Sequence, residues 1–281
     1  MTRARGVRTG ERAAREAGQS VEFLDYRPYQ PGDEPRAVDW RAYARSGRLY
    51  TRLYHAERAA DLHVLLDTSP SMRLYGKRRW ASALARVLTG LGRHEAGTRV
   101  HLLDGRASAP GRGRRDVAAL RRFVEAAGEV PEQEDASLAD RWAARLLAMP
   151  PHPGAAVAVA ISDLLDPAPL RPLLAAARAR RVDLLLLHTL GAAELGPESG
   201  RFELVDVEDG SIVEVGPDEV RAYREAVLDF VARVRAETAS AGQRHVLLPA
   251  PAEAAERSTD DARLERAAFA ALVRAGVVGR R

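Results

Sequence analysis

The sequence predicts an α/β protein whose doubly wound, mostly parallel sheet lies between two layers of helices, preceded by an extension rich in aromatic residues and arginine. Short apolar runs alternate with amphipathic segments from residue 62 onward, which is typical of repeated βαβ units. The run at 62–66 ends at Asp67 and is followed by Ser and Pro, as expected of a strand buried on both faces. Residues 61–281 contain no linker-like stretch, so we expect one domain there, with residues 1–60 as a segment packed on it.

Each further element follows from its own pattern. Trp80, Leu84 and Leu91 share one face of a helix that begins after a glycine. Similar helical spacing, or an apolar run between turn residues, marks the remaining elements. Helices are expected at 77–91, 114–127, 137–149, 170–180, 218–241 and 260–273, strands at 98–103, 155–161, 182–188 and 245–248, and a loop at 105–113. Residues 202–207 and 212–215 flank an Asp-Gly turn and are expected to pair as a hairpin.

The segment at 20–58 holds seven of the chain's 15 aromatic residues, interleaved with arginine and acidic residues. Proline and glycine exclude a regular helix at 28–35, and residues 49–54 alternate as an edge strand does. Aromatic stacking and charge-assisted hydrogen bonds are expected to hold the segment in a compact loop. Two interpretations stay open, a structural flap on the main domain or a surface that docks a partner.

Bulk properties exclude several classes of protein. The chain has 281 residues, of which 46% are hydrophobic and 29% charged, and no apolar stretch reaches the ~20 residues of a membrane span. The absence of cysteine excludes disulfides and thiolate metal sites, and residues 1–5 do not begin a signal peptide, so we expect a cytoplasmic protein. Residues 1–60 hold 12 arginines and 8 acidic residues, whereas the rest of the chain has 31 basic and 31 acidic residues. Because no basic face is concentrated in the main domain, we do not expect nucleic-acid binding.

Polar residues follow two of the predicted strands and form the candidate site. Asp67 ends the strand at 62–66 and precedes Ser69 and Ser71, and Asp163 follows the strand at 155–161. Because carboxyl ends of parallel strands meet at one edge of a sheet, we expect both acids there. Carboxylate and hydroxyl oxygens suit Mg²⁺, which takes six oxygens at roughly 2.1 Å. In the alternative interpretation, the two acids are turn residues or helix caps and need no metal.

Several motifs of the chain also occur together in a known family. They are Arg27-Pro-Tyr-Gln-Pro-Gly-Asp33, Arg36, Val38-Asp39-Trp40, Ala44-Arg45-Ser46-Gly47, Leu49, Glu57 and Asp67-x-Ser69-x-Ser71. From about residue 20 to the end, the chain resembles the bacterial "domain of unknown function 58" family. The resemblance implies a von Willebrand factor A-like domain of the Rossmann-type three-layer class, with a metal-ion-dependent adhesion site. In such a site Ser69 and Ser71 would bind the ion directly, Asp67 and Asp163 would act mainly through water, and a partner's carboxylate would take the open position.

The threonine ligand that the resemblance also implies is not matched. Alanine stands in its place in Glu134-Asp135-Ala136-Ser137-Leu138. Ser137 replaces the threonine if the loop shifts by one residue, and Asp135 is the other candidate ligand. The implied ion is Mg²⁺, or else Mn²⁺ or Ca²⁺, and a site without metal stays an alternative because of Ala136.

The leading hypothesis for function is a non-enzymatic protein-binding module or adaptor. The resemblance implies a MoxR-type AAA+ ATPase as its partner, in protein maturation or complex assembly. One alternative is a metal-dependent phosphoester hydrolase with an aspartate nucleophile. Ser69 stands where such enzymes need a second acid, and the seven histidines are scattered, which counts against catalysis. The other alternative is a metal-free structural scaffold.

Overall fold

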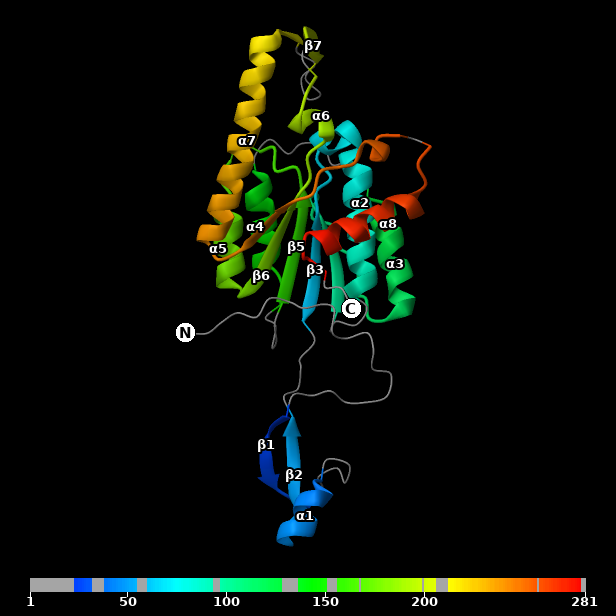
Figure 1. Cartoon of the computed structure of the whole chain (residues 1–281), viewed down its shortest axis with the longest axis vertical. Coiled ribbons are helices and arrows are strands. Elements are labelled where there is room, and N and C mark those ends of the chain that lie inside the picture. The colour runs from blue at the N-terminus through cyan, green and yellow to red at the C-terminus, as the bar shows by residue number, and fades with distance from the viewer. Residues whose placement is uncertain are drawn as a thin grey trace. The chain divides into compact units, whose positions relative to one another are not determined.

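The computed structural model describes residues 23–31, 38–54, 60–92, 97–127, 136–150, 156–166, 168–198, 200–205, 212–256 and 258–278. The chain forms two compact units, residues 1–58 and residues 59–280 (Figure 1). The larger unit contains the predicted sheet with its helices, and the smaller unit contains the aromatic-rich segment.

Among the described residues of the larger unit, five parallel strands form one sheet in the order β4-β3-β5-β6-β9. Their bounds are β3 (Asp61–Leu66), β4 (Gly97–Leu102), β5 (Ala156–Ser162), β6 (Val182–His188) and β9 (Arg244–Leu247). Numbered along the chain the order is 2-1-3-4-5, so the direction of winding reverses between β3 and β5. The predicted α/β fold with a doubly wound parallel sheet is thereby confirmed.

Helices cover both faces of the sheet and complete three layers (Figure 1). One layer contains α2 (Lys77–Leu91), α3 (Arg114–Glu125) and α8 (Asp261–Arg274), and the other contains α4 (Leu138–Leu147), α5 (Arg171–Ala179) and α7 (Pro217–Ser240). Alternate residues of β3 face the two layers, since Val64 and Leu66 pack with the first and Leu65 with the second. Burial on both faces explains why the strands read as continuous apolar runs.

The sequence predicts a loop at 105–113, and the structure confirms it, because the segment contains no helix or named strand, although part of it lies along β4. Thr98 exchanges two backbone hydrogen bonds with Gly111, at 2.9 and 2.7 Å, and the Ser108 N–H donates to the Val100 carbonyl at 2.9 Å. Residues 106–111 therefore run antiparallel to β4. These isolated bridges pair the loop with the edge strand β4 without making it a strand of the sheet.

Between β6 and β9 the chain forms α6, a hairpin and the long α7. β7 (Phe202–Val205) and β8 (Ile212–Val215) pair antiparallel, which confirms the predicted hairpin, while its turn lies outside the described residues.

The sequence patterns did not mark three short helical elements, η2 (Pro70–Gly76), α6 (Ala192–Leu195) and η4 (Ala252–Ala254). Although α7 has 24 residues, no helix in the described part of the chain is both long and apolar enough for a bilayer.

The smaller unit consists of a two-stranded sheet and one short helix. Its elements are β1 (Phe23–Pro28), α1 (Trp40–Ser46) and β2 (Tyr50–Tyr54), and the antiparallel β1–β2 pair confirms the strand predicted at 49–54. The carboxylate of Asp39 accepts two backbone N–H groups of the first turn of α1, at 2.9 and 3.0 Å, and the Tyr26 hydroxyl at 2.9 Å. Gly47 ends the helix with φ of +66°. Asp39 and Gly47 therefore fix the two ends of α1.

Candidate functional site

The register between β3 and β5 places Asp67 beside the end of β5. Leu66 is paired with Ile161, and the Asp67 N–H donates to the Ile161 carbonyl at 3.0 Å. Asp67, Ser162 and Asp163 therefore meet at the carboxyl edge of the sheet, where the winding reverses. Open α/β sheets bind their ligands at this position.

Asp67 is buried, with 1% of its surface exposed, and both of its carboxylate oxygens accept hydrogen bonds. The Ser162 hydroxyl donates to Oδ2 at 2.5 Å, and the Ser69 N–H donates to Oδ1 at 2.8 Å. Burial, followed by the negative charge of Asp163, raises the pKa of Asp67 to about 6, although the hydrogen bonds from Ser162 and Ser69 act in the opposite direction. Asp163 is thus close enough to influence the ionisation of Asp67.

The hydroxyls of Ser69 and Ser71 lie 3.1 Å apart at the half-buried rim above Asp67. Ser69 precedes η2, and Pro70 at the first position of η2 restricts the turn. Oxygens in neighbouring positions of an octahedral Mg²⁺, each at roughly 2.1 Å, lie about 3 Å apart, so this separation suits two ligands of one ion. In the described part of the chain no group of three His, Asp or Glu side chains is arranged to hold a metal, so an ion here would depend on the hydroxyls.

Asp163 binds a lysine that the sequence analysis does not anticipate. The Lys77 ammonium donates to Oδ2 of Asp163 at 2.8 Å and to Oε1 of Glu194 at 2.5 Å, and its side chain is fully buried. The other oxygen of Glu194 accepts the Gly191 N–H at 2.6 Å. Lys77 therefore connects the start of α2, the loop after β5 and α6 in one buried network.

The amino-acid composition could have drawn attention to Lys77 before the structure was known. Lys77 is the only lysine among 43 lysine and arginine residues. A compact ammonium with three donors suits a closed space between two carboxylates, whereas the guanidinium of arginine is larger and planar. A positive charge in the first turn of a helix also opposes the helix dipole, so the carboxylates, not the helix, explain its position.

The buried cluster carries more negative than positive charge. Asp67, Asp163 and Glu194 are at most 7% exposed, and Lys77 is the cation that contacts two of them. His188 adds no charge, because burial is the largest of the effects that lower its pKa to about 3, and its Nε2 donates to the Asp163 carbonyl at 2.8 Å. Two formal negative charges remain when all three carboxylates are ionised. Such an excess favours a proton on Asp67 or a bound cation.

The Ser137 side chain caps the N-terminus of α4. Its Oγ accepts the Asp140 N–H at 3.0 Å and donates to the Asp140 carboxylate at 2.7 Å. Among the described residues, no hydrogen bond joins Ser137 to the Asp67 loop. Ala136 offers no side-chain oxygen, and Asp135 lies outside the described residues. The predicted residues that the structure brings to one edge of the sheet are Asp67, Ser69, Ser71 and Asp163.

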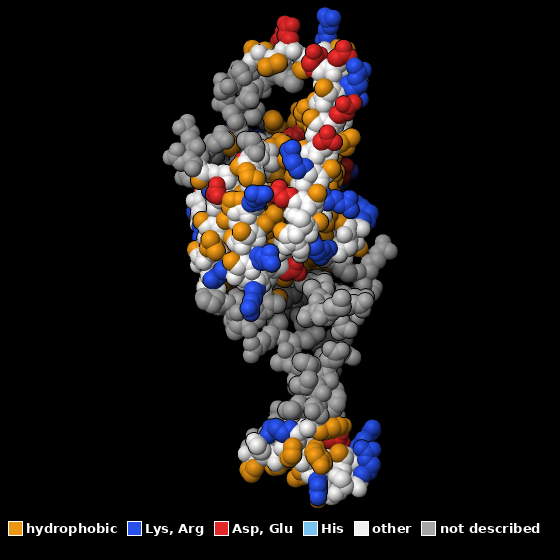
Figure 2. All heavy atoms as spheres, turned by 90° about the vertical axis from the view of Figure 1, so that its left-hand side faces the viewer, with side chains coloured by type: hydrophobic (Ala, Val, Ile, Leu, Met, Phe, Trp, Pro, Cys, Tyr) orange, Lys and Arg blue, Asp and Glu red, His pale blue; other side chains and the backbone are white. Residues whose placement is uncertain are grey.

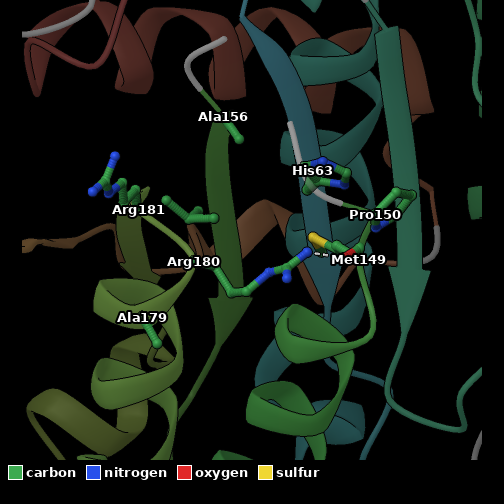
Figure 3. Close-up of a pocket in the computed structure, with 8 residues that line it drawn as sticks. His63, Met149, Pro150, Ala156, Ala179, Arg180 and Arg181 are labelled. Carbon is green, nitrogen blue, oxygen red and sulfur yellow. Dashed lines mark hydrogen bonds between the residues drawn. The ribbon is translucent and has the colours of Figure 1, made fainter. Parts of the chain in front are cut away.

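A hollow lies at the opposite, amino edge of the sheet (Figure 3). It is lined by His63, Met149, Pro150, Ala156, Ala179, Arg180, Arg181 and Val182. The Arg180 guanidinium extends from the end of α5 and donates to the Met149 carbonyl just beyond α4. Because this bond ties two helix ends together at the edge away from the switch point, we assign the hollow to helix packing.

The fold and the candidate site define a class of protein, a three-layer Rossmann-like α/β domain with a polar site at the switch point of its sheet. The sequence then identifies the family. Residues 25–238 match the family described as "Protein of unknown function DUF58", and the chain belongs to it. The predicted family is confirmed, and the match includes residues of both units.

Relatives and a solved structure extend this comparison. The uncharacterized proteins Rv1480 and MT1527 of Mycobacterium tuberculosis and Mb1516 of Mycobacterium bovis are each 30% identical over 225 residues, which cover 76% of this chain and 69% of theirs. The conserved hypothetical protein BatB from Bacteroides thetaiotaomicron aligns with a TM-score of 0.42 and 12% identity, over 78% of this chain and 99% of that one. This structural likeness is too distant to support a functional argument.

Proposed function

We propose that this protein is a non-enzymatic binding module whose von Willebrand factor A-like domain holds a partner protein through a divalent cation. Ser69 and Ser71 would hold the ion directly, and Asp67 and Asp163 would act through water. Mg²⁺, or Mn²⁺ or Ca²⁺, would supply an open coordination position for a carboxylate of the partner. The cation therefore selects for an acidic side chain.

The observation that carries this proposal is the 3.1 Å separation of the Ser69 and Ser71 hydroxyls. The pair lies beside a buried cluster with two excess negative charges, which a divalent cation would neutralise. Uncompensated charge at this depth is costly, so the cluster favours a hard cation. The donors are all oxygens, which is the ligand type that Mg²⁺, Mn²⁺ and Ca²⁺ prefer.

We propose a MoxR-type AAA+ ATPase as the partner, in protein maturation or complex assembly. Support for this partner comes from the family to which residues 25–238 match, since the family resemblance implies such an ATPase. Purified ATPase is expected to be retained by this protein in the presence of Mg²⁺ and released by excess chelator. Retention that survives the chelator would reject the ion bridge, and no retention in either condition would reject the partner.

The single lysine provides a direct test for the cation. In protein labelled with isotopic lysine, the side-chain nitrogen of Lys77 gives one ammonium signal, which reports on Asp163 at 2.8 Å. Mg²⁺ is expected to shift this signal and to give saturable heat in calorimetry, and Ser71→Ala is expected to remove both effects. Ser240→Ala, which removes an exposed hydroxyl at the end of α7, is the matched control. An unchanged Lys77 signal without binding heat would contradict the metal site.

Lys77 also favours a second candidate function, a metal-free scaffold that binds its partner at the same edge. Its ammonium already neutralises Asp163, and Ala136 stands where a threonine ligand is expected. In this case Asp67 reduces the remaining charge by holding a proton. Calorimetry without Mg²⁺ binding, together with chelator-resistant retention of the ATPase, would favour this candidate.

A further inference from the structure

The α1 helix of the smaller unit is held firmly but buries none of its own residues. Asp39, which caps it, is 3% exposed and also accepts the Tyr26 hydroxyl. Backbone hydrogen bonds fix the flanking chain, from Asp39 N–H to the Tyr50 carbonyl at 2.8 Å and from Tyr29 N–H to the Leu49 carbonyl at 3.0 Å. The position of α1 in its unit therefore comes from its caps and its flanks, and its side chains stay available.

Large aromatic side chains project from this helix. Trp40 is 58% exposed and Tyr43 is 45% exposed, and their rings meet edge to face at a centroid distance of 6.4 Å. The other two tryptophans, Trp80 and Trp142, are 2% and 1% exposed and belong to the core of the larger unit. An exposed tryptophan on a fixed helix is unusual for a residue that only stabilises a fold, and such residues concentrate in binding hot spots.

The exposed charged side chains on α1 and directly after it are positive. Arg41, Arg45 and Arg48 are exposed, and in the described part of the chain none of them forms an ion pair. The capping acid Asp39 is buried and bonded, so it does not offset them at the surface. Residues 1–60 as a whole contain 12 arginines and 8 acidic residues, whereas the rest of the chain is balanced. Figure 2 shows hydrophobic and basic side chains beside each other on this unit.

We propose that this surface, the α1 patch formed by Trp40, Arg41, Tyr43, Arg45 and Arg48, binds an acidic polypeptide segment that also carries apolar side chains. The arginines pair with carboxylates in a fork geometry, and the exposed rings bury the apolar groups. Because α1 is already fixed by its caps, little conformational entropy is lost on binding. The patch belongs to the smaller unit and the candidate site at Asp67 to the larger unit, so the patch would give the chain a second contact.

The geometry of the rings favours a polypeptide partner over a nucleic acid. Bases stack on exposed aromatic faces along a basic groove. Trp40 and Tyr43 meet at an interplanar angle of 89°, so one ring's edge is turned to the other ring's face and the pair forms no flat stacking platform. A patch on a helix of seven residues also gives no continuous basic track along a strand of phosphates. Edge-to-face aromatics with arginine suit a folded or extended polypeptide better.

The test uses the full chain and titrates four probes, poly-L-glutamate, a random copolymer of glutamate and tyrosine, phosphatidylserine vesicles and oligothymidylate. Trp40 is the natural reporter, because the other two tryptophans are buried. We expect the copolymer to shift Trp40 emission to the blue and to bind about tenfold more tightly than poly-L-glutamate, since the apolar contacts add roughly 1.4 kcal/mol. Calorimetry measures the affinities independently of fluorescence.

Two charge reversals distinguish the patch from general electrostatics. Arg41→Glu puts an acid in the first turn of α1, where the helix dipole favours it, so loss of binding there cannot come from melting of the helix. Arg178→Glu makes the same charge change on the exposed side of α5. We expect Arg41→Glu to weaken copolymer binding about tenfold and Arg178→Glu to leave it unchanged.

Several results would overturn the proposal. They are equal loss in both charge variants, equal affinity for poly-L-glutamate and the copolymer, or no binding to either. A larger Trp40 shift with vesicles or with oligothymidylate would reassign the patch to a membrane or to a nucleic acid.

Discussion

The ammonium of Lys77 and a carboxylate oxygen of Asp163 lie 2.8 Å apart inside the protein, and neither side chain is more than 2% exposed. Lys77 begins α2 and Asp163 follows β5, so the bond crosses the point where the sheet reverses its winding. The chain uses arginine at every other basic position but places its single lysine here. We infer that the carboxyl edge of the sheet owes its geometry to this ion pair, whether or not a cation joins it.

Lys77→Met tests the contribution of this pair to stability. The substitution leaves Asp163 and Glu194 buried without their cation, so the free energy of unfolding is expected to fall by about 3–5 kcal/mol. Urea denaturation followed by circular dichroism measures the change. Arg178→Met removes an exposed basic residue from α5 and is expected to stay within about 0.5 kcal/mol of the parent. A loss below about 1 kcal/mol for Lys77→Met would show that the two carboxylates do not need the ammonium.

Asp39→Ala tests whether the cap determines the conformation of α1. Alanine cannot accept the two N–H groups of the first turn or the Tyr26 hydroxyl, so the smaller unit is expected to lose about 0.5–2 kcal/mol. Asp39→Asn keeps an acceptor at the cap and is expected to lose much less. Hydrogen exchange of the α1 amides measures the effect locally. Equal exchange in the alanine and asparagine variants would mean that the strands alone hold the helix.

His101 in β4 is expected to make the protein sensitive to acid. Its Nε2 lies 3.0 Å from Nδ1 of His63, and burial, followed by the nearby positive groups His63, Arg145 and Arg99, lowers its pKa to about 3. In the unfolded chain His101 has a pKa near 6.5. Between pH 6.5 and about 3, His101 is therefore protonated in the unfolded chain but neutral in the folded protein. The free energy of unfolding therefore falls as the pH decreases, by on the order of 2–4 kcal/mol at pH 4.

His101→Gln isolates this effect, because glutamine does not titrate. Urea denaturation across a series of pH values is expected to give a smaller loss for the variant than for the parent between pH 6.5 and 4. His245→Gln removes a half-buried histidine on β9, whose pKa is also lowered by burial. Its pH profile shows how much of the pH dependence of the free energy of unfolding comes from a histidine other than His101. Parallel pH profiles for the parent and His101→Gln would contradict the assignment.

The sequence predicts the placement of Asp67 and Asp163 well, because apolar runs mark strands and strand ends in a parallel sheet share one edge. It does not predict Lys77, because the partners of its ammonium come from segments 86 and 117 residues away. Periodicity describes each helix by itself and contains no information about which buried charges will meet. Ser137 illustrates the same limit, since its hydroxyl caps its own helix and the motif alone does not reveal this local competition.

The same substitution at two glycines has opposite expected effects. A Cβ at Gly191 would lie 2.4 Å from Cβ of Tyr75, whose own backbone is constrained at φ of +54°, so Gly191→Ala is expected to cost about 1–3 kcal/mol. The displacement would also disturb the Gly191 N–H that binds Glu194, and with it the Lys77 network. At Gly90 in α2 a Cβ meets no atom within 4 Å, and Gly90→Ala is expected to stabilise the helix by about 0.5–1 kcal/mol. Urea denaturation measures the free energy of unfolding of both variants. A lower value for Gly191→Ala together with a higher value for Gly90→Ala would attribute the cost to the contact with Tyr75. Lower values for both variants would instead indicate a general intolerance of alanine.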